Sequence, residues 1–157
     1  MPQLITIATF LATLGSGLMA GLFFTYSNSI MPSLARVPVP QGVLAMNTIN
    51  AVIQNPLFLA IFMGTALLCL VIIAGALLGW TPRPLWAALG AVLYLAGCIA
   101  VTIGINVPMN NALAAVAADS AEAARLWTTY LDRWVFWNHI RAAACTASMA
   151  ALIVALM

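Results

Sequence analysis

Charge is scarce in this sequence. Only 5% of its 157 residues are Asp, Glu, Lys or Arg, and none of them is a lysine. A soluble domain carries roughly 25% charged residues, whereas 65% of this chain is hydrophobic. A soluble globular domain is therefore excluded, and the composition is that of an integral membrane protein whose main partner is the lipid bilayer. A net charge of +2 without a basic cluster gives no reason to expect a nucleic-acid partner.

Side chains that ligate metals or carry redox chemistry are also few. His139 is the only histidine, and Cys69, Cys98 and Cys145 each lie alone inside an apolar run. Without a CxxC pair, we interpret the cysteines as small buried hydrophobic residues. One histidine and no close carboxylate cluster argue against a zinc or di-iron site, and no Gly-rich nucleotide loop occurs. The sequence therefore predicts neither a metal nor another cofactor.

Four apolar runs are long enough to cross a bilayer, which takes about 20 residues of helix. The first run lacks a basic leading segment, so we interpret it as a retained helix rather than a signal peptide. We predict an all-α, antiparallel four-helix membrane bundle that forms one domain over residues 1–157. A multi-pass protein of the bacterial inner membrane is the expected setting. The predicted spans are residues 4–26, 56–78, 85–106 and 134–157.

The two long connections are predicted to contain short helices. Residues 42–54 have an amphipathic pattern. Residues 112–134 are helix-prone, with Asp119 and Glu122 spaced as a capping box and Glu122 placed to pair with Arg125.

Proline is expected to interrupt two of the spans. Pro32 should end the first helix, and Pro108 should break or kink the third.

Both long connections leave the same end of an antiparallel bundle, opposite the tight turn near Arg83. Arg36, Arg125 and Arg133 flank the long connections. The positive-inside rule would place that end in the cytoplasm.

The last apolar run opens with an unusual polar face. Trp134, Asn138 and Arg141 follow one another at helical steps of three or four residues. Polar and charged groups are costly inside a membrane and by default indicate a site or a pathway. Alternatively, Arg141 extends to the lipid headgroups and the tryptophans form an interfacial belt. The stretch alone leaves both interpretations open.

Four polar segments should meet at one end of the bundle, where sites in such folds are built from facing helices. They are residues 26–29, 47–54, 106–111 and 134–141. Arg141 cannot pair with Asp132 on a continuous helix, because nine residues place them on opposite sides. A buried guanidinium without a carboxylate would retain affinity for an anionic or carbonyl-bearing ligand.

The functional hypothesis is a site that stabilises an oxyanion. Arg141 would supply charge, and amides would supply hydrogen-bond donors, while aromatic rings would stack on a flat apolar substrate. His139 is the one obvious general base, although it points away from the Asn138 and Arg141 face, which favours an interfacial role. The candidate catalytic residues are Arg141, Asn138, His139, Asn106 and Asn110, and the candidate substrate-binding residues are Trp134, Trp137, Tyr26, Asn50, Asn111 and Met31.

Three motifs resemble the anthrone oxygenase family of small four-helix membrane proteins. They are SNSIMPSL at residues 27–34, NVPMNNAL at 106–113 and WxxWNHxR at 134–141. The family's fungal members are linked to the oxidation of anthrones to anthraquinones without a metal or organic cofactor. The resemblance implies that an electron-rich aromatic substrate is deprotonated and that its enolate gives an electron to dioxygen. It also implies site roles for Asn106, Asn110, Trp134, Asn138 and Arg141.

Two functions remain open at this point. The first is a cofactor-independent oxygenase, or related oxidoreductase, acting on a lipophilic aromatic molecule. The second is a non-catalytic module that binds a lipophilic ligand or a partner helix, with asparagines joining the helices. A closed site with a ligand-sized cavity lined by Arg141 and the asparagines would favour the first. Asparagines that all bond to one another or to the backbone, without a cavity, would favour the second. A transporter is less favoured, and homo-oligomerisation stays open.

Overall fold

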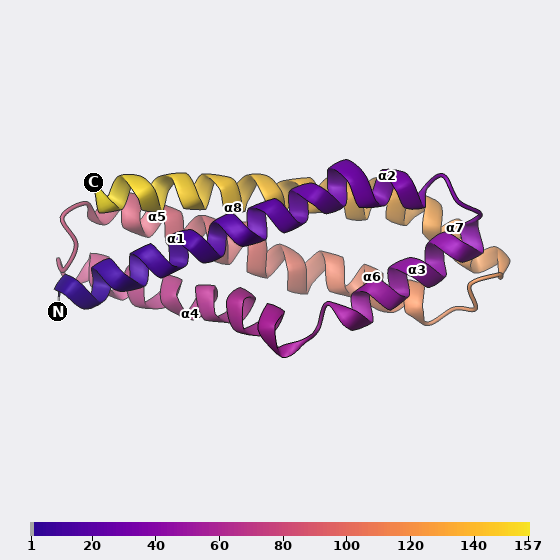
Figure 1. Cartoon of the computed structure of the whole chain (residues 1–157), viewed down its shortest axis with the longest axis horizontal. Helices are drawn as coiled ribbons and strands as arrows, with labels where there is room; N and C mark the ends of the chain where they lie inside the picture. The colour runs from indigo at the N-terminus through magenta and orange to yellow at the C-terminus, as the bar shows by residue number, and fades with distance from the viewer. Residues whose placement is uncertain (1) are drawn as a thin grey trace.

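Four long helical columns pack side by side in an elongated antiparallel bundle (Figure 1). The computed structural model describes residues 2–157, and this part of the chain contains no strand. Four of its helices are long and apolar enough to cross a membrane. The predicted all-α membrane bundle is thus confirmed. Both termini lie at the end where α4 turns into α5, which we call the turn end. The opposite end, formed by α2, α3, α6 and α7, we call the outer end.

Two columns and one connecting helix form the first half of the chain. The first column contains α1 (Pro2–Thr25), the π-helical turn η1 (Tyr26–Ile30) and α2 (Met31–Leu34). Helix α3 (Val39–Val52) leads to the second column, α4 (Pro56–Leu77).

The second half of the chain supplies the other two columns. The third contains α5 (Pro84–Tyr94), the π-helical turns η2 (Leu95–Ala100) and η3 (Thr102–Asn106), and α6 (Val107–Ala114). The fourth contains α7 (Ala121–Thr129), η4 (Tyr130–Trp134) and α8 (Val135–Leu156).

Both helices continue past their prolines, so the predicted helix end at Pro32 and the predicted break at Pro108 are wrong, and a kink at Pro108 stays a prediction. The first column continues past Pro32 to Leu34, and the third continues past Pro108 to Ala114. Proline lacks an N–H and crowds the carbonyl four residues earlier. A π-helical turn directly precedes α2, which contains Pro32, and another precedes α6, which contains Pro108. Such local widening can accommodate proline and pair the freed backbone groups.

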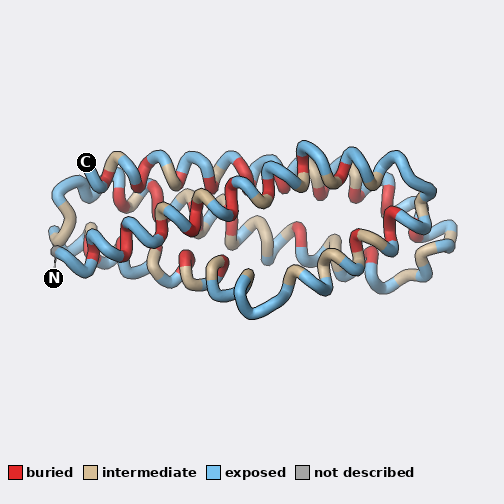
Figure 2. Tube along the Cα trace, in the orientation of Figure 1, coloured by how far each residue is buried: buried red, intermediate tan, exposed pale blue. Residues whose placement is uncertain are grey.

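Small residues bring the membrane-spanning helices close together. A Cβ at Gly90 of α5 would lie 3.1 Å from the Ser148 carbonyl oxygen of α8. The Ser148 hydroxyl donates to the Gly90 carbonyl at 2.7 Å and lies 3.2 Å from the Ser16 hydroxyl of α1. Three helices therefore share a buried polar layer. Figure 2 shows the buried residues on the inward side of the helices and exposed residues on the outward side.

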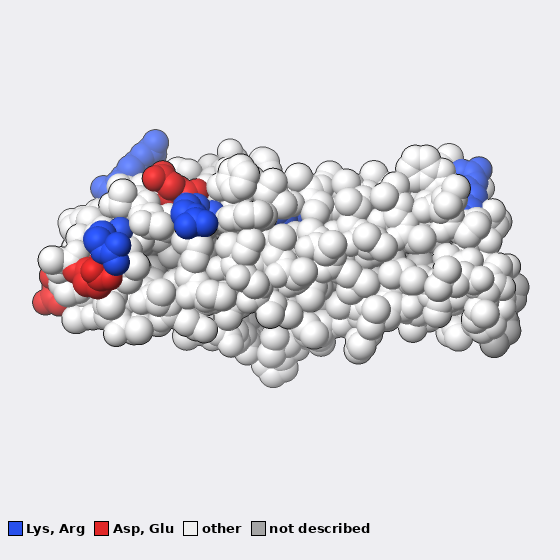
Figure 3. Space-filling view, turned by 180° about the vertical axis from the view of Figure 1, so that it is seen from behind, with Lys and Arg blue, Asp and Glu red and all other residues white. Residues whose placement is uncertain are grey.

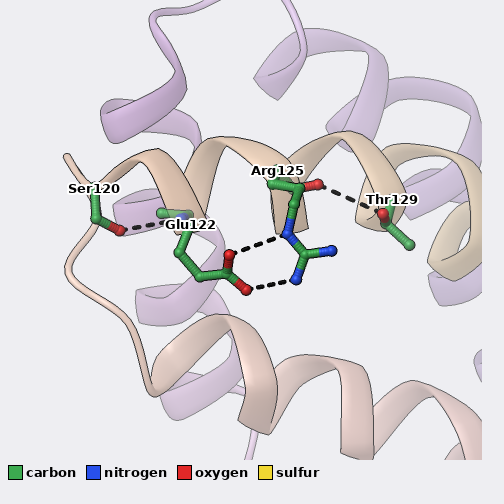
Figure 4. Close-up of polar contacts among 5 residues, drawn as sticks. Ser120, Glu122, Arg125 and Thr129 are labelled. Atoms are coloured by element: carbon green, nitrogen blue, oxygen red, sulfur yellow. Dashed lines mark hydrogen bonds and ion pairs between the residues drawn. The ribbon is translucent and has the colours of Figure 1, made fainter.

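A second apolar cluster holds the outer end together. It joins side chains of α2, α3, α6, α7 and η4, namely Met31, Val43, Met46, Leu113, Trp127, Tyr130 and Trp134. Helix α7 begins with Ser120 as its N-cap, whose hydroxyl accepts from the Ala123 N–H at 3.0 Å. The cap is thus Ser120 and not the predicted Asp119. The predicted pair of Glu122 with Arg125 is present at 2.6 Å (Figure 4).

Helix lengths show where the bilayer fits. Helix α4 has 22 residues, or ~33 Å at 1.5 Å per residue, close to the ~30 Å hydrocarbon core. The fourth column, Ala121–Leu156, has 36 residues, or ~54 Å. The outer end therefore extends past the level where α4 begins. Charged side chains gather at this end on the face seen in Figure 3, and the middle of that face is almost free of charge.

Candidate functional site

A cavity of about 520 Å³ lies where α4 begins, between the membrane-spanning bundle and the outer end. Residues from all four columns and from α3 line it. Leu22, Phe23 and Phe58 are among its apolar walls. Its polar or partly polar lining residues are Tyr26, Asn47, Asn50, Gln54, Thr102, Asn110, Asn111, Trp134, Asn138 and Arg141.

Arg141 is the buried cation of this cavity, with 5% of its surface exposed. Its Nη2 donates to Asn138 Oδ1 at 2.6 Å and its Nη1 to Thr102 Oγ1 at 3.2 Å. The guanidinium carbon lies 4.3 Å from the centroid of the Phe23 ring and 5.2 Å from that of Trp134. Such cation–π contacts stabilise a desolvated guanidinium without neutralising its charge.

No acidic side chain in the described chain offsets this charge. The single ion pair found among residues 2–157 joins Arg125 to Glu122 on the exposed surface of α7. Asp132 is exposed, as the nine-residue spacing from Arg141 led us to expect. The Arg141 Nε is also buried without a hydrogen-bond partner. The cavity is therefore electropositive and has an unused donor on its cation.

Asn138 fixes the position of Arg141. It is fully buried, and its Nδ2 donates to the Phe23 carbonyl at 2.7 Å and to Ser27 Oγ at 2.6 Å. Its Oδ1 is left to accept from Arg141. Because all these groups are held by α1, η1 and α8, the guanidinium is anchored to the first and fourth columns.

Asn110 is the centre of a second polar cluster, toward the outer end. Its Oδ1 accepts from the Tyr130 hydroxyl at 2.7 Å and from Trp134 Nε1 at 2.8 Å. Its Nδ2 donates to Asn50 Oδ1 at 3.2 Å. The rings of Tyr130 and Trp134 are stacked, with centroids 5.2 Å apart. This cluster orients the Trp134 ring between Asn110 and Arg141.

Two further asparagines have a buried oxygen without a partner. Asn106 donates from Nδ2 to the Trp134 carbonyl at 3.2 Å, but its Oδ1 has no partner. Asn47 lines the cavity and its Oδ1 is likewise buried and unpartnered. Unsatisfied buried polar atoms are uncommon in native proteins. The cavity region therefore has several polar atoms that the protein itself does not satisfy.

The structure brings together most of the candidate residues but not all of them. Tyr26, Asn50, Asn110, Asn111, Trp134, Asn138 and Arg141 line the cavity. Asn106 is not among the lining residues but contacts the main chain of Trp134.

Three candidates, His139, Trp137 and Met31, are not among the residues that line the cavity. His139 is exposed, because one residue step of about 100° turns it away from the face of Asn138. The same rotation in the other direction places Trp137 in a different groove. Met31 is buried in the apolar cluster of the outer end.

Some participants were not identified as site residues from the sequence. Phe23, Thr102, Ser27 and Tyr130 contact the site residues across helices, and Asn47 lines the cavity. Ser27 and Asn47 belong to polar segments that were expected to meet, but neither was named as a site residue. The π-helical turns η1, η3 and η4 carry several site residues, and such turns are frequent at functional sites. For these additional contacts, the one signal available in the sequence was the clustering of asparagines near Pro32 and Pro108.

The sequence is similar to one family of known proteins. The model of the family described as anthrone oxygenase matches residues 57–151, which is more than half of the chain. The protein belongs to the anthrone oxygenase family. No curated protein and no solved structure matches this anthrone oxygenase family member. The matched region contains Thr102, Asn110, Asn138 and Arg141, whereas the cavity walls from α1, η1 and α3 lie before it.

Among the residues that the structure describes, no three His, Cys, Asp or Glu side chains gather as a metal-binding group. The structure contains features of both functions that the sequence left open, the oxygenase and the non-catalytic binding module. A ligand-sized cavity lined by Arg141 is present, and Asn50 and Asn110 also bond to one another.

Proposed function

We propose that this anthrone oxygenase family member is a membrane-embedded oxygenase that oxidises a lipophilic, anthrone- or quinol-like aromatic molecule without a cofactor. The observation that carries the proposal is Arg141. It is a buried cation that lines a cavity, and no acid pairs with it within residues 2–157. Burying an unpaired charge is costly. The presence of the Arg141 guanidinium in the cavity wall is best explained by an anion that forms in the cavity.

The electrostatic setting supports catalysis at this place. A cation and oriented donors act more strongly in a low-dielectric, water-poor cavity than in water. Arg141 is held in position by Asn138 and Thr102 before any ligand arrives. It would therefore stabilise an enolate or phenolate without reorganising, and would stabilise superoxide formed next to it in the same way.

The size and walls of the cavity suit a flat aromatic substrate. Its volume of about 520 Å³ is within the ~300–1,000 Å³ typical of ligand sites. Aromatic rings from three columns, those of Phe23, Phe58 and Trp134, contribute to its wall. Offset or edge-on contacts with these rings would orient the substrate's ring system.

The proposed reaction balances with dioxygen as the only oxidant. The substrate CH₂ group loses a proton, and the enolate passes one electron to O₂. The carbon radical and superoxide combine, the peroxide takes up a proton, and loss of water leaves a ketone carbonyl. One oxygen atom of O₂ enters the product and the other leaves as water. Since no carboxylate or histidine lines the cavity, the first proton would pass to water near the exposed Gln54 and Asn111.

A ligand-binding module without catalysis is the second candidate. It is favoured by the absence of a conventional general base from the cavity lining and by the mutual bonding of Asn50, Asn110 and Tyr130. The same cavity would then bind a lipophilic phenol or quinone without converting it.

Oxygen uptake by the purified protein distinguishes these two candidates. Dioxygen consumption is measured in detergent with an anthrone and with a hydroquinone, and ¹⁸O₂ is used to follow the incorporated atom. We expect one labelled atom in the ketone formed from the anthrone. Arg141→Gln should reduce the rate at least ~100-fold, as for the loss of an oxyanion donor, and Arg141→Lys should retain part of it because the charge remains.

Arg36→Gln is the matched control, because Arg36 is exposed and does not line the cavity. It should leave the rate unchanged, and thermal unfolding verifies that each variant is folded. Saturable binding of the anthrone without oxygen uptake would replace the oxygenase with the binding module. Equal activity in wild type and folded Arg141→Gln would contradict the assigned role of the cation.

A further inference from the structure

A second groove, of about 360 Å³, lies between the third and fourth columns. Its walls are mainly apolar and include Ile105, Pro108 and Leu126. Tyr130 borders the groove, and its hydroxyl is directed to Asn110 of the cavity. The groove is thus a separate concave surface, which the proposed oxidation does not use.

Helix geometry places this groove at the edge of the membrane. Phe58 near the start of α4, Thr102 and Arg141 line one cavity and so lie at similar depth. Trp137 lies one helical turn before Arg141, or ~6 Å nearer the outer end. Arg133 lies two turns before Arg141, or ~12 Å nearer the outer end. The polar interface occupies ~5–8 Å on each side of the hydrocarbon core. The groove therefore runs from the hydrocarbon edge into the lipid headgroup region.

Two hydrogen-bond donors in the groove are unused. Arg133 is exposed, and neither its guanidinium nor the Trp137 indole N–H bonds to another described residue. The Thr129 hydroxyl, by contrast, donates to the Arg125 carbonyl at 3.4 Å. A cation and an indole one turn apart beside an apolar groove can bind a phosphate and the ester region below it.

The end of the groove nearer the hydrocarbon is open. Gly104 lines it, and a Cβ added there would meet no atom within 4 Å. Ile103, which precedes Gly104, is also an exposed apolar residue. An acyl chain can therefore lie along η3 without displacing protein atoms.

We propose that this groove binds an anionic phospholipid, with its phosphate at Arg133 and one acyl chain along Gly104. An acyl chain is already surrounded by hydrocarbon in the bilayer, so its contact with the groove gives little selectivity. The charge of the headgroup provides the preference, because Arg133 forms no ion pair with an acidic side chain among residues 2–157. The proposal is independent of any oxidation in the cavity.

Lipid retention measured by native mass spectrometry tests this site. Wild-type protein is mixed with equal amounts of phosphatidylglycerol and phosphatidylcholine that have the same chains. We expect at least a fivefold preference for phosphatidylglycerol. Arg133→Gln should abolish the preference, whereas Arg36→Gln, which removes another exposed arginine of the outer end, should keep it.

A second variant tests the groove rather than the charge. Gly104→Leu fills the open end and should lower retention of both lipids. Gly64→Leu is its control, because Gly64 of α4 also has open space around a Cβ but lies outside the groove. Thermal unfolding confirms that the variants are folded. The proposal is wrong if folded Arg133→Gln keeps the preference, if Arg36→Gln loses it equally, or if Gly104→Leu retains lipid as Gly64→Leu does.

Discussion

At the scale of single residues, the site depends on groups that satisfy one another across helices. The spacing of Asn138 and Arg141 on one helical face was readable from the sequence, and the two side chains do bond at 2.6 Å. Their other partners, among them Phe23 and Thr102, come from different columns. Such partners depend on the register between helices. A single sequence shows which residues share a face of one helix, but it gives no comparably direct signal for the register between two helices.

Asn138 should be the most sensitive of these residues for stability. Asn138→Leu leaves the Phe23 carbonyl, Ser27 and one Arg141 donor without their partner in a fully buried place. Each unsatisfied buried group costs about 1–3 kcal/mol, although polar contacts in membrane proteins are often worth less. We expect the free energy of unfolding to fall by about 2–4 kcal/mol, measured by denaturation in mixed micelles.

Asn28→Leu is the matched control, since Asn28 is exposed one residue after Ser27. Its free energy of unfolding should change by less than about 0.5 kcal/mol. A similar small change for Asn138→Leu would show that water or lipid replaces its hydrogen bonds.

At the scale of helices, apolar runs and charge patterns predicted which segments are helical, but not how continuous they are. Prolines normally end a helix, so Pro32 and Pro108 led us to expect helices that end earlier than Leu34 and Ala114, where α2 and α6 end. The π-helical turns η1 and η3 resolve the conflict and also direct Ser27 and Thr102 toward Asn138 and Arg141. We attribute these π-helical turns to packing against the neighbouring helices. The local sequence alone therefore did not reveal them.

Helix contacts make a prediction at Gly90, where α5 lies against α8. A side chain there would meet Leu152 Cγ at 2.7 Å and the Ser148 carbonyl oxygen at 3.1 Å. Gly90→Leu should separate α5 from α8 and disturb the buried layer of Ser16 and Ser148. Overpacking of this kind costs about 1–3 kcal/mol or more, to be measured as a lower free energy of unfolding.

Gly64→Leu makes the comparison specific to packing, because it introduces the same side chain into α4 where nothing lies within 4 Å. It should be neutral or slightly stabilising, since leucine is a better helix former than glycine. Equal destabilisation by both substitutions would mean that the backbone conformation of glycine matters, not the contact of α5 with α8.

At the scale of the whole molecule, the sequence predicted the architecture well because lipid restricts the choices. Only helices or closed barrels satisfy every backbone group in hydrocarbon, and four apolar runs with two long connections leave an antiparallel bundle as the simple arrangement. The unpredicted feature is the length of the outer end, which extends past α4 and forms its own apolar cluster. That extension encloses the site, so the cavity could not be foreseen from the spans alone.

The distribution of arginines predicts how the molecule is oriented in the membrane. Arg36, Arg125 and Arg133 belong to the outer end and Arg83 to the turn end, so the positive-inside rule predicts that the outer end is in the cytoplasm. Cysteine labelling in intact bacterial cells checks this. Thr81→Cys, in the turn between α4 and α5, should react with a membrane-impermeant maleimide, whereas Ala117→Cys, before α7, should react only after permeabilisation.

The native chain provides a low background for this measurement, because Cys69, Cys98 and Cys145 are all buried and free of disulfides. Wild-type protein should stay unlabelled in both conditions. The reverse pattern, with Ala117→Cys labelled in intact cells, would place the outer end outside the cell. The cavity, which is lined by residues of α3 and of the start of α4, would then receive its substrate from the outer side of the bilayer. The predicted pattern instead requires a lipophilic substrate that is produced in the cytoplasm or has already crossed the membrane.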